Sequence, residues 1–136
     1  MKKSERQVEV LLESLIEVTN IEKVIESLPR GYISVKQIAG HTYYYRQWRE
    51  GSKIISSYVP ESYLNVVKQK IAIRKQNEEL LKILKKDYKK ALRAALKNGD
   101  VSEEKVEEVK DSIKKMSEEE LLDYSSHQAL KEKLLA

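Results

Sequence analysis

The sequence lacks cysteine altogether, and it has only two histidines among its 136 residues. Without cysteine, neither a disulfide framework nor a thiolate metal site can form, which fits a reducing compartment. His41 and His127 lie in different predicted elements, and neither has a second ligand at helical or hairpin spacing. This arrangement argues against a histidine-based metal site, so we expect no metal and no cofactor.

Long hydrophobic runs are also missing. No segment approaches the roughly 20 apolar residues that a membrane-spanning helix needs. The first four residues lead into an amphipathic helix pattern rather than a signal-peptide core. Charged residues make up 35% of the chain, and the mean hydropathy is -0.60. We therefore expect a soluble, cytoplasmic protein that does not enter a membrane.

The chain has little that indicates catalysis. Its four glycines are isolated and form no phosphate-cradling motif. The acidic residues Glu118 to Glu120 occupy a predicted first helical turn, where carboxylates stabilise the helix dipole. Ser125, Ser126 and His127 are adjacent, but a helix directs neighbouring side chains to different faces, and no nucleophile elbow surrounds them. We expect no catalytic residues and no enzymatic activity.

What the chain does contain is an uneven distribution of charge. Residues 1–29 carry four Lys/Arg against six Asp/Glu, residues 30–97 carry sixteen against five, and residues 98–136 carry six against eleven. The net charge of +4 is thus the balance of a basic centre and two acidic ends. The basic centre either attracts a polyanion or docks against the acidic helices of the same chain.

The spacing of apolar residues predicts a helix at each side of a central sheet, and hence an α+β fold. The first helix begins near residue 5, continues as one piece or breaks at Thr19 and Asn20, and ends before Pro29. A second helix of 38 residues runs from residue 60 to residue 97, because neither Gly nor a second Pro interrupts it.

Between these helices, residues 32–38, 42–49 and 53–59 are rich in aromatic and β-branched side chains. Short segments with a glycine separate them, at residues 39–41 and 50–52, as three-residue hairpin loops require. The pattern predicts a three-stranded antiparallel meander.

The second of these loops sets the expected pairing between strands, with Arg49 opposite Lys53 and Trp48 opposite Ile54. One face of the sheet then carries Tyr44, Arg46, Trp48, Ile54, Ser56 and Tyr58. The other face carries Tyr43, Tyr45, Gln47, Arg49, Lys53, Ile55 and Ser57. We expect the first face to be the core, because it places Trp48, Ile54 and Tyr58 together.

The second half of the chain reads as a helical bundle or a coiled coil. Residues 74–79 are polar on all sides and are expected to be exposed, and an apolar stripe at near-heptad spacing follows them. Two further helices are expected, the first capped by Asp100 and Glu103 and the last by Ser117 and Glu120. We divide the chain into residues 1–29 as an N-terminal helical segment, residues 30–72 as the sheet with the start of the long helix, and residues 73–136 as the remaining helices.

The central residues carry a resemblance. The chain resembles a group of short, uncharacterised prokaryotic proteins at Leu28-Pro29-Arg30-Gly31, in the run from Tyr43 to Gly51, at Lys53 and in the run from Ser56 to Pro60. Their shared pattern is an LPxG start, a YYYxQWREG hairpin and a long charged helix, and here it covers residues 28–90. The resemblance implies a fold but no activity. More distantly, a meander followed by a helix is similar to the arm-type DNA-binding domains of tyrosine recombinases, whose catalytic residues are absent here.

Basic residues interleaved with tyrosines are typical of nucleic-acid binding, because cations contact phosphates while rings and amides contact bases. We therefore predict a DNA-binding protein of a mobile element or a regulatory system. The predicted binding residues are Arg30, Lys36, Tyr43, Tyr45, Arg46, Gln47, Arg49 and Lys53. The open alternative at the tyrosines is purely structural, with rings that stiffen the strands through cross-strand pairs.

A different function for the long helix also stays open. Its apolar stripe at Leu80, Leu81, Leu84 and Tyr88 needs a partner, which is either another helix of the chain or a second copy. The second possibility makes the protein an interaction or assembly module that dimerises through this helix.

Overall fold

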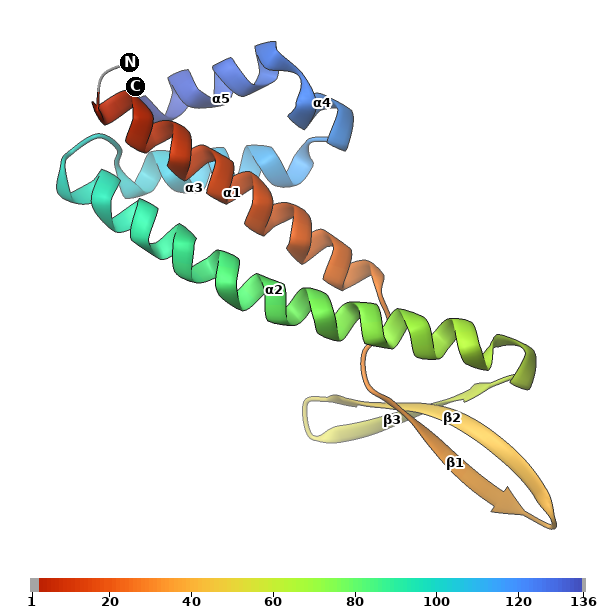
Figure 1. Cartoon of the computed structure of the whole chain (residues 1–136). Coiled ribbons are helices and arrows are strands. Elements are labelled where there is room, and N and C mark those ends of the chain that lie inside the picture. Colours follow the sequence, from red (N-terminus) through yellow and green to blue (C-terminus); the bar gives the residue numbers. More distant parts are fainter. Residues whose placement is uncertain (1–2, 136) are drawn as a thin grey trace. The chain divides into compact units, whose positions relative to one another are not determined.

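The computed structural model describes residues 3–135 and confirms the α+β fold (Figure 1). In chain order the elements are α1 (Lys3–Ser27), β1 (Tyr32–Ile38), β2 (His41–Glu50), β3 (Lys53–Val59), the single 3-10 turn η1 (Glu61–Tyr63), α2 (Leu64–Lys97), α3 (Glu103–Lys115), α4 (Glu118–Leu122) and α5 (Tyr124–Leu135). They form two compact units. Residues 24–79 make the sheet unit, and residues 3–23 and 80–135 make the helical unit.

The helical unit holds the larger hydrophobic core. α1, α3 and α5 contribute apolar side chains at helical spacing, which places them on one face of each helix, whereas α4 contributes Leu121. The buried members are Val8, Leu11, Leu12, Leu15, Ala95, Val101, Val106, Val109, Ile113, Leu121, Leu130 and Leu134. α1 is one unbroken helix, which continues through the expected break at Thr19 and Asn20 to Ser27. Thr19 itself is buried, at 3% exposed.

Caps define the helices that follow α2. Ser102 is the N-cap of α3, where its hydroxyl accepts from the Lys105 N–H, so the cap lies two residues after the predicted Asp100. Ser117 and Glu120 form the expected capping box. The helix that they begin ends at Leu122, however, and Asp123 starts α5 by accepting from the Ser126 N–H. The expected last helix is therefore two, and α5 packs against both α3 and α4.

The sheet has the expected strand order, β1-β2-β3, with both pairs antiparallel. Its hairpin loops are shorter than predicted, because β2 begins at His41 and continues to Glu50. Ala39 and Gly40 both have positive φ, at 51° and 83°, which is the geometry of a type I′ turn. Two-residue loops of this kind match the right-handed twist of β-strands, and Figure 1 shows a twisted sheet.

The shorter second loop corrects the predicted pairing of β3. Glu50 lies opposite Lys53, Arg49 opposite Ile54 and Trp48 opposite Ile55. Because side chains alternate along a strand, this shift of one residue moves every side chain of β3 to the other face. The expected core face was therefore wrong in its β3 residues. Ile54, Ser56 and Tyr58 share a face with Arg49, whereas Lys53, Ile55 and Ser57 share a face with Trp48.

Candidate nucleic-acid interface and an adjacent arginine cleft

One face of the sheet, here called the tyrosine face, collects most of the tyrosines of the sheet unit. Strand pairing places on it Tyr32, Ser34, Lys36, Ile38, His41, Tyr43, Tyr45, Gln47, Arg49, Ile54, Ser56 and Tyr58. The face is open to solvent at both outer strands, with Tyr32 53%, Tyr58 55% and Ile54 61% exposed. It carries the cations Lys36 and Arg49 and no carboxylate.

The side chains of the tyrosine face contact one another. The Tyr58 ring lies 6.4 Å from the Tyr43 ring and 5.9 Å from the Tyr45 ring, between ring centroids. The Lys36 ammonium lies 4.9 Å from the centre of the Tyr45 ring, within the range of a cation–π interaction. These contacts hold the rings in place before any partner arrives, so the surface is preorganised.

The structure brings five of the eight predicted binding residues together on this face. They are Lys36, Tyr43, Tyr45, Gln47 and Arg49. Arg46 and Lys53 lie on the opposite face, and Arg30 lies in the segment that precedes β1. Sequence reasoning missed Tyr58 here because the assumed loop was one residue too long.

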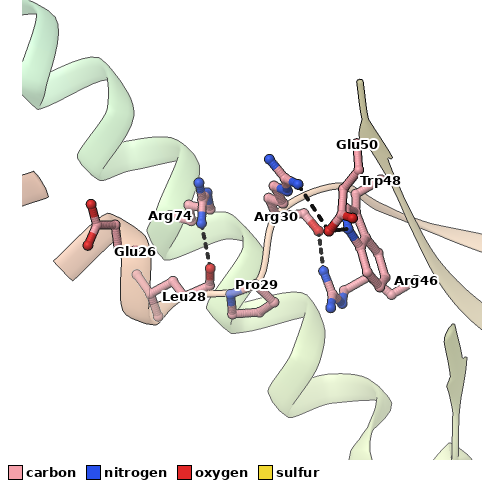
Figure 2. Close-up of a pocket in the computed structure, with 8 residues that line it drawn as sticks. All are labelled: Glu26, Leu28, Pro29, Arg30, Arg46, Trp48, Glu50 and Arg74. Carbon is pink, nitrogen blue, oxygen red and sulfur yellow. Dashed lines mark hydrogen bonds and ion pairs between the residues drawn. The ribbon is translucent and has the colours of Figure 1, made fainter. Parts of the chain in front are cut away.

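A second group of charged side chains lines a cleft on the opposite side of the sheet, here called the arginine cleft (Figure 2). The cleft has a volume of about 380 Å³. It is lined by Glu26, Leu28, Pro29, Arg30, Arg46, Trp48, Glu50 and Arg74, all of which belong to the sheet unit.

Trp48 and Arg46 form the wall of the arginine cleft on β2. The Arg46 guanidinium stacks on the indole, 3.8 Å from its ring centre, and its Nη1 donates to the Arg30 carbonyl at 2.7 Å. Nε1 of Trp48 donates to the Glu50 carboxylate at 3.0 Å, and the same carboxylate pairs with Arg30 at 3.4 Å. The turn before β1 is thereby joined to the middle of β2.

Arg74 reaches the arginine cleft from α2. Its Nη1 donates to the carbonyls of Ile25 and Leu28, at 2.7 and 2.6 Å, and its Nε donates to Glu78 at 3.0 Å. Both carbonyls lie at the end of α1, where backbone acceptors have no partner within the helix. The expectation that residues 74–79 are wholly exposed was wrong for Arg74, whose side chain is only 18% exposed. No signal near residue 74 in the sequence indicates this contact, because its acceptors lie 46 and 49 residues away.

The three arginines of the cleft also affect one another electrostatically. Burial lowers the pKa of Arg46, and the nearby positive charges of Arg30 and Arg74 lower it further. Arg46 remains a cation at neutral pH, because the pKa of a free guanidinium is so high. Its charge is therefore held at an energetic disadvantage that a bound anion would relieve.

Neither face provides for a metal. Among residues 3–135, no group of three or more His, Cys, Asp or Glu side chains gathers where it could hold an ion. In the same part of the chain, no helix is both long enough and apolar enough to cross a membrane.

Comparison with known protein families finds a match over residues 1–69, to a domain of unknown function described as DUF6788. The matched segment covers α1, the whole sheet and the start of α2, so it begins earlier and ends earlier than the expected resemblance over residues 28–90. No curated protein and no solved structure matches the chain significantly. The similarity to the arm-type domains of tyrosine recombinases thus receives no support.

Proposed function

Because the chain belongs to the DUF6788 family, whose description assigns no function, we propose a function from surface chemistry: the tyrosine face binds DNA and catalyses no reaction on it. One observation carries this proposal. The three strands contain a single carboxylate, Glu50, and it lies on the face opposite Lys36 and Arg49. A surface that is exposed, cationic and free of acids favours a polyanionic partner.

The side chains of the tyrosine face supply both kinds of contact that a DNA-binding surface uses. Lys36 and Arg49 suit phosphate oxygens, and the Gln47 amide suits a base edge. The Tyr58 and Tyr45 rings offer planar surfaces to unpaired bases or sugars. Strands are known to enter a DNA groove, so a small antiparallel sheet is a suitable scaffold.

The ring contacts within this face equally fit the structural alternative, in which the tyrosines only stiffen the sheet. The two roles differ in what the cations do. A purely structural face uses Lys36 only for its contact with the Tyr45 ring, whereas a DNA-binding face depends on the charges of both Lys36 and Arg49.

Fluorescence anisotropy of a labelled duplex at low salt tests the proposal. We expect a binding curve that weakens steeply as salt rises, and a smaller salt dependence in the double variant Lys36→Ala/Arg49→Ala, because each lost phosphate contact reduces the slope by about one. Lys53→Ala is the matched control, since it removes a cation of the same sheet from the opposite face. Equal binding by the double variant and the control, or no binding by the native protein, would rule the function out.

A labelled single strand in the same titration identifies the role of the rings. If Tyr45 stacks on bases, Tyr45→Ala weakens single-strand binding by roughly 1–3 kcal/mol, and Tyr45→Phe leaves it nearly unchanged. The setting in a mobile element or a regulatory system stays a hypothesis that the family match does not support.

A second function, assembly through α2, is favoured by exposed apolar residues on that helix. Leu80 is 41% and Ile83 is 60% exposed. Tyr88, by contrast, packs against the core of the helical unit, and Leu81 and Leu84 are half-buried. We therefore propose that any dimer of this chain uses Leu80 and Ile83 rather than the full stripe that the sequence indicates.

Light scattering over a range of protein concentrations tests assembly. We expect the mass to rise towards that of two chains, and Leu80→Asp/Ile83→Asp to keep it at that of one chain. Leu122→Asp is the control, because Leu122 is an equally apolar residue, 88% exposed, on a different helix. A native protein that stays at the mass of one chain throughout would exclude this function.

A further inference from the structure

We propose that the arginine cleft is a binding site for a phosphate group. The site is independent of the DNA-binding proposal, because Arg46 and Trp48 project from the sheet face opposite the tyrosine face. The cleft volume of about 380 Å³ lies within the range of ligand pockets, so it admits a phosphate with part of the molecule that bears it.

The guanidinium groups come from three separate segments of the sheet unit. Arg30 lies in the turn before β1, Arg46 lies on the central strand and Arg74 lies on α2. Figure 2 shows Arg30 and Arg46 beside Trp48, with Arg74 at the other side of the same cleft. A ligand in the cleft is thus offered N–H donors from more than one direction.

Three carboxylates lie at or beside the cleft, and the ion pairs that they form reach two of the three arginines, since Glu26 lines the cleft without pairing with any of them. Glu50 pairs with Arg30, and Glu78 pairs with Arg74. Within residues 3–135, no carboxylate pairs with Arg46, which contacts the Trp48 ring and the Arg30 carbonyl. A partly buried guanidinium beside two other cations, without a carboxylate in direct contact, favours an anionic ligand.

Arg46 is also held in a fixed orientation. Stacking on Trp48 fixes the plane of its guanidinium, and the 2.7 Å hydrogen bond to the Arg30 carbonyl fixes one of its nitrogens. The remaining N–H groups are then preorganised, which reduces the entropy that a ligand has to overcome. Donors from several directions suit a tetrahedral phosphate better than a flat carboxylate, which presents only two oxygens in one plane.

The residues that carry the sequence resemblance build the frame of this cleft. Leu28 and Pro29 come from the LPxG pattern, and Trp48 and Glu50 come from the YYYxQWREG pattern. Arg30 and Arg46 occupy the two positions that these patterns leave open.

Trp48 makes the proposal directly testable, because it is the only tryptophan of the protein and it lines the cleft. We expect inorganic phosphate to change its fluorescence emission along a saturating curve, and chloride or acetate at matched ionic strength to have no saturating effect. Glycerol phosphate and dimethyl phosphate identify the source: saturation by the first indicates a terminal phosphate, and saturation by the second indicates an internal phosphate of a chain. A response to acetate equal to that to phosphate, or no saturation by any phosphate, overturns the proposal.

Arg46→Gln should raise the half-saturating phosphate concentration roughly tenfold or more, because it removes a charged donor. Lys68→Gln is the control, because Lys68 is an exposed cation of the sheet unit that does not line the cleft, and it should leave that concentration within about twofold of the native value. If circular dichroism shows that Arg46→Gln is unfolded, Arg30→Gln replaces it with the same expectation. Folded variants that bind phosphate as well as the native protein contradict the assignment.

Discussion

At the scale of single residues, Gly31 is the one of the four glycines that leaves no room for a side chain. Its φ is +102°, and an added Cβ would lie 2.0 Å from the Gln47 carbonyl oxygen, which belongs to the backbone and cannot move aside. We predict that Gly31→Ala lowers the free energy of unfolding by at least about 2 kcal/mol, measured by urea denaturation. Gly51→Ala is the control, because that position has a positive φ but open space, and its cost should be about 1 kcal/mol.

Glu9 of α1 carries a carboxylate that contacts two side chains of α5, His127 and Lys131. Burial alone would raise its pKa, but hydrogen bonds with His127 and Lys131 of α5 hold the pKa below the ordinary 4.5. A carboxyl whose pKa is lowered by folding stabilises the protein above that ordinary value, and the stabilisation disappears as the pH falls through the lowered pKa.

We therefore predict that Glu9→Gln lowers the free energy of unfolding by about 1 kcal/mol at neutral pH, and by progressively less as the pH falls below 4.5 to about 3. Thermal unfolding followed at both pH values measures the difference. Glu13→Gln, at an exposed position of the same helix, should have no effect at either pH. A loss of stability in Glu9→Gln that is the same at both pH values would show that its ionised carboxylate is not responsible.

At the scale of elements, the pairing of β3 decides what the sheet exposes. The register places Tyr58 beside Tyr45 and away from Trp48. We predict nuclear Overhauser contacts between the ring protons of Tyr58 and Tyr45, and none between the rings of Tyr58 and Tyr44, which the expected register would place opposite each other. The reverse pattern would restore the register expected from a three-residue loop.

The same register predicts how β3 responds to truncation. Tyr58→Ala should lower the stability of the sheet unit by about 1 kcal/mol, because it removes two ring contacts. Ser57→Ala, which changes the neighbouring side chain on the other face, should have an effect below about 0.5 kcal/mol. Both values come from urea denaturation followed through Trp48 emission.

The strands could be predicted from their composition, but the faces of β3 could not. Its sequence places two isoleucines together and two serines together, at residues 54–57, so apolar and polar residues do not alternate. Where alternation is absent, burial does not specify the register, and the loop length alone decides it. β2 differs, because the separation of Tyr43 and Tyr45 from Tyr44 and Trp48 follows from alternation whatever the loop.

At the scale of the whole molecule, Leu134 shows how the helical unit depends on distant segments. It is fully buried near the end of α5, in a core that also includes Leu11 of α1 and Ala95 of α2. We predict that Leu134→Ala lowers the free energy of unfolding by about 2–5 kcal/mol, whereas Leu135→Ala, at a 43% exposed position, changes it by less than about 0.5.

The division into two units adds a second expectation for Leu134→Ala. Circular dichroism at about 222 nm reports mainly on the helices. Trp48 emission reports on the sheet unit. We expect the ellipticity transition to shift more than the emission transition. Equal shifts would mean that both units unfold in one cooperative step.

How far the sequence predicts the structure differs between the two units. The helices and their caps follow from local signals such as Ser117 with Glu120. The arginine cleft does not, since Arg74 binds carbonyls of a helix end that lies more than 40 residues earlier. Such a contact is tertiary, and a polar segment that makes it looks the same in sequence as one exposed to water.

The order of the segments along the chain also bears on folding during synthesis. All residues of the sheet unit, 24–79, leave the ribosome before any residue from 80 onwards. The helical unit joins residues 3–23 to residues 80–135, so its core is complete only when Leu130 and Leu134 have been made. The apolar face of α1 therefore has no core to join until residues 80–135 have been made, and it is a surface of the nascent chain that a chaperone would need to protect.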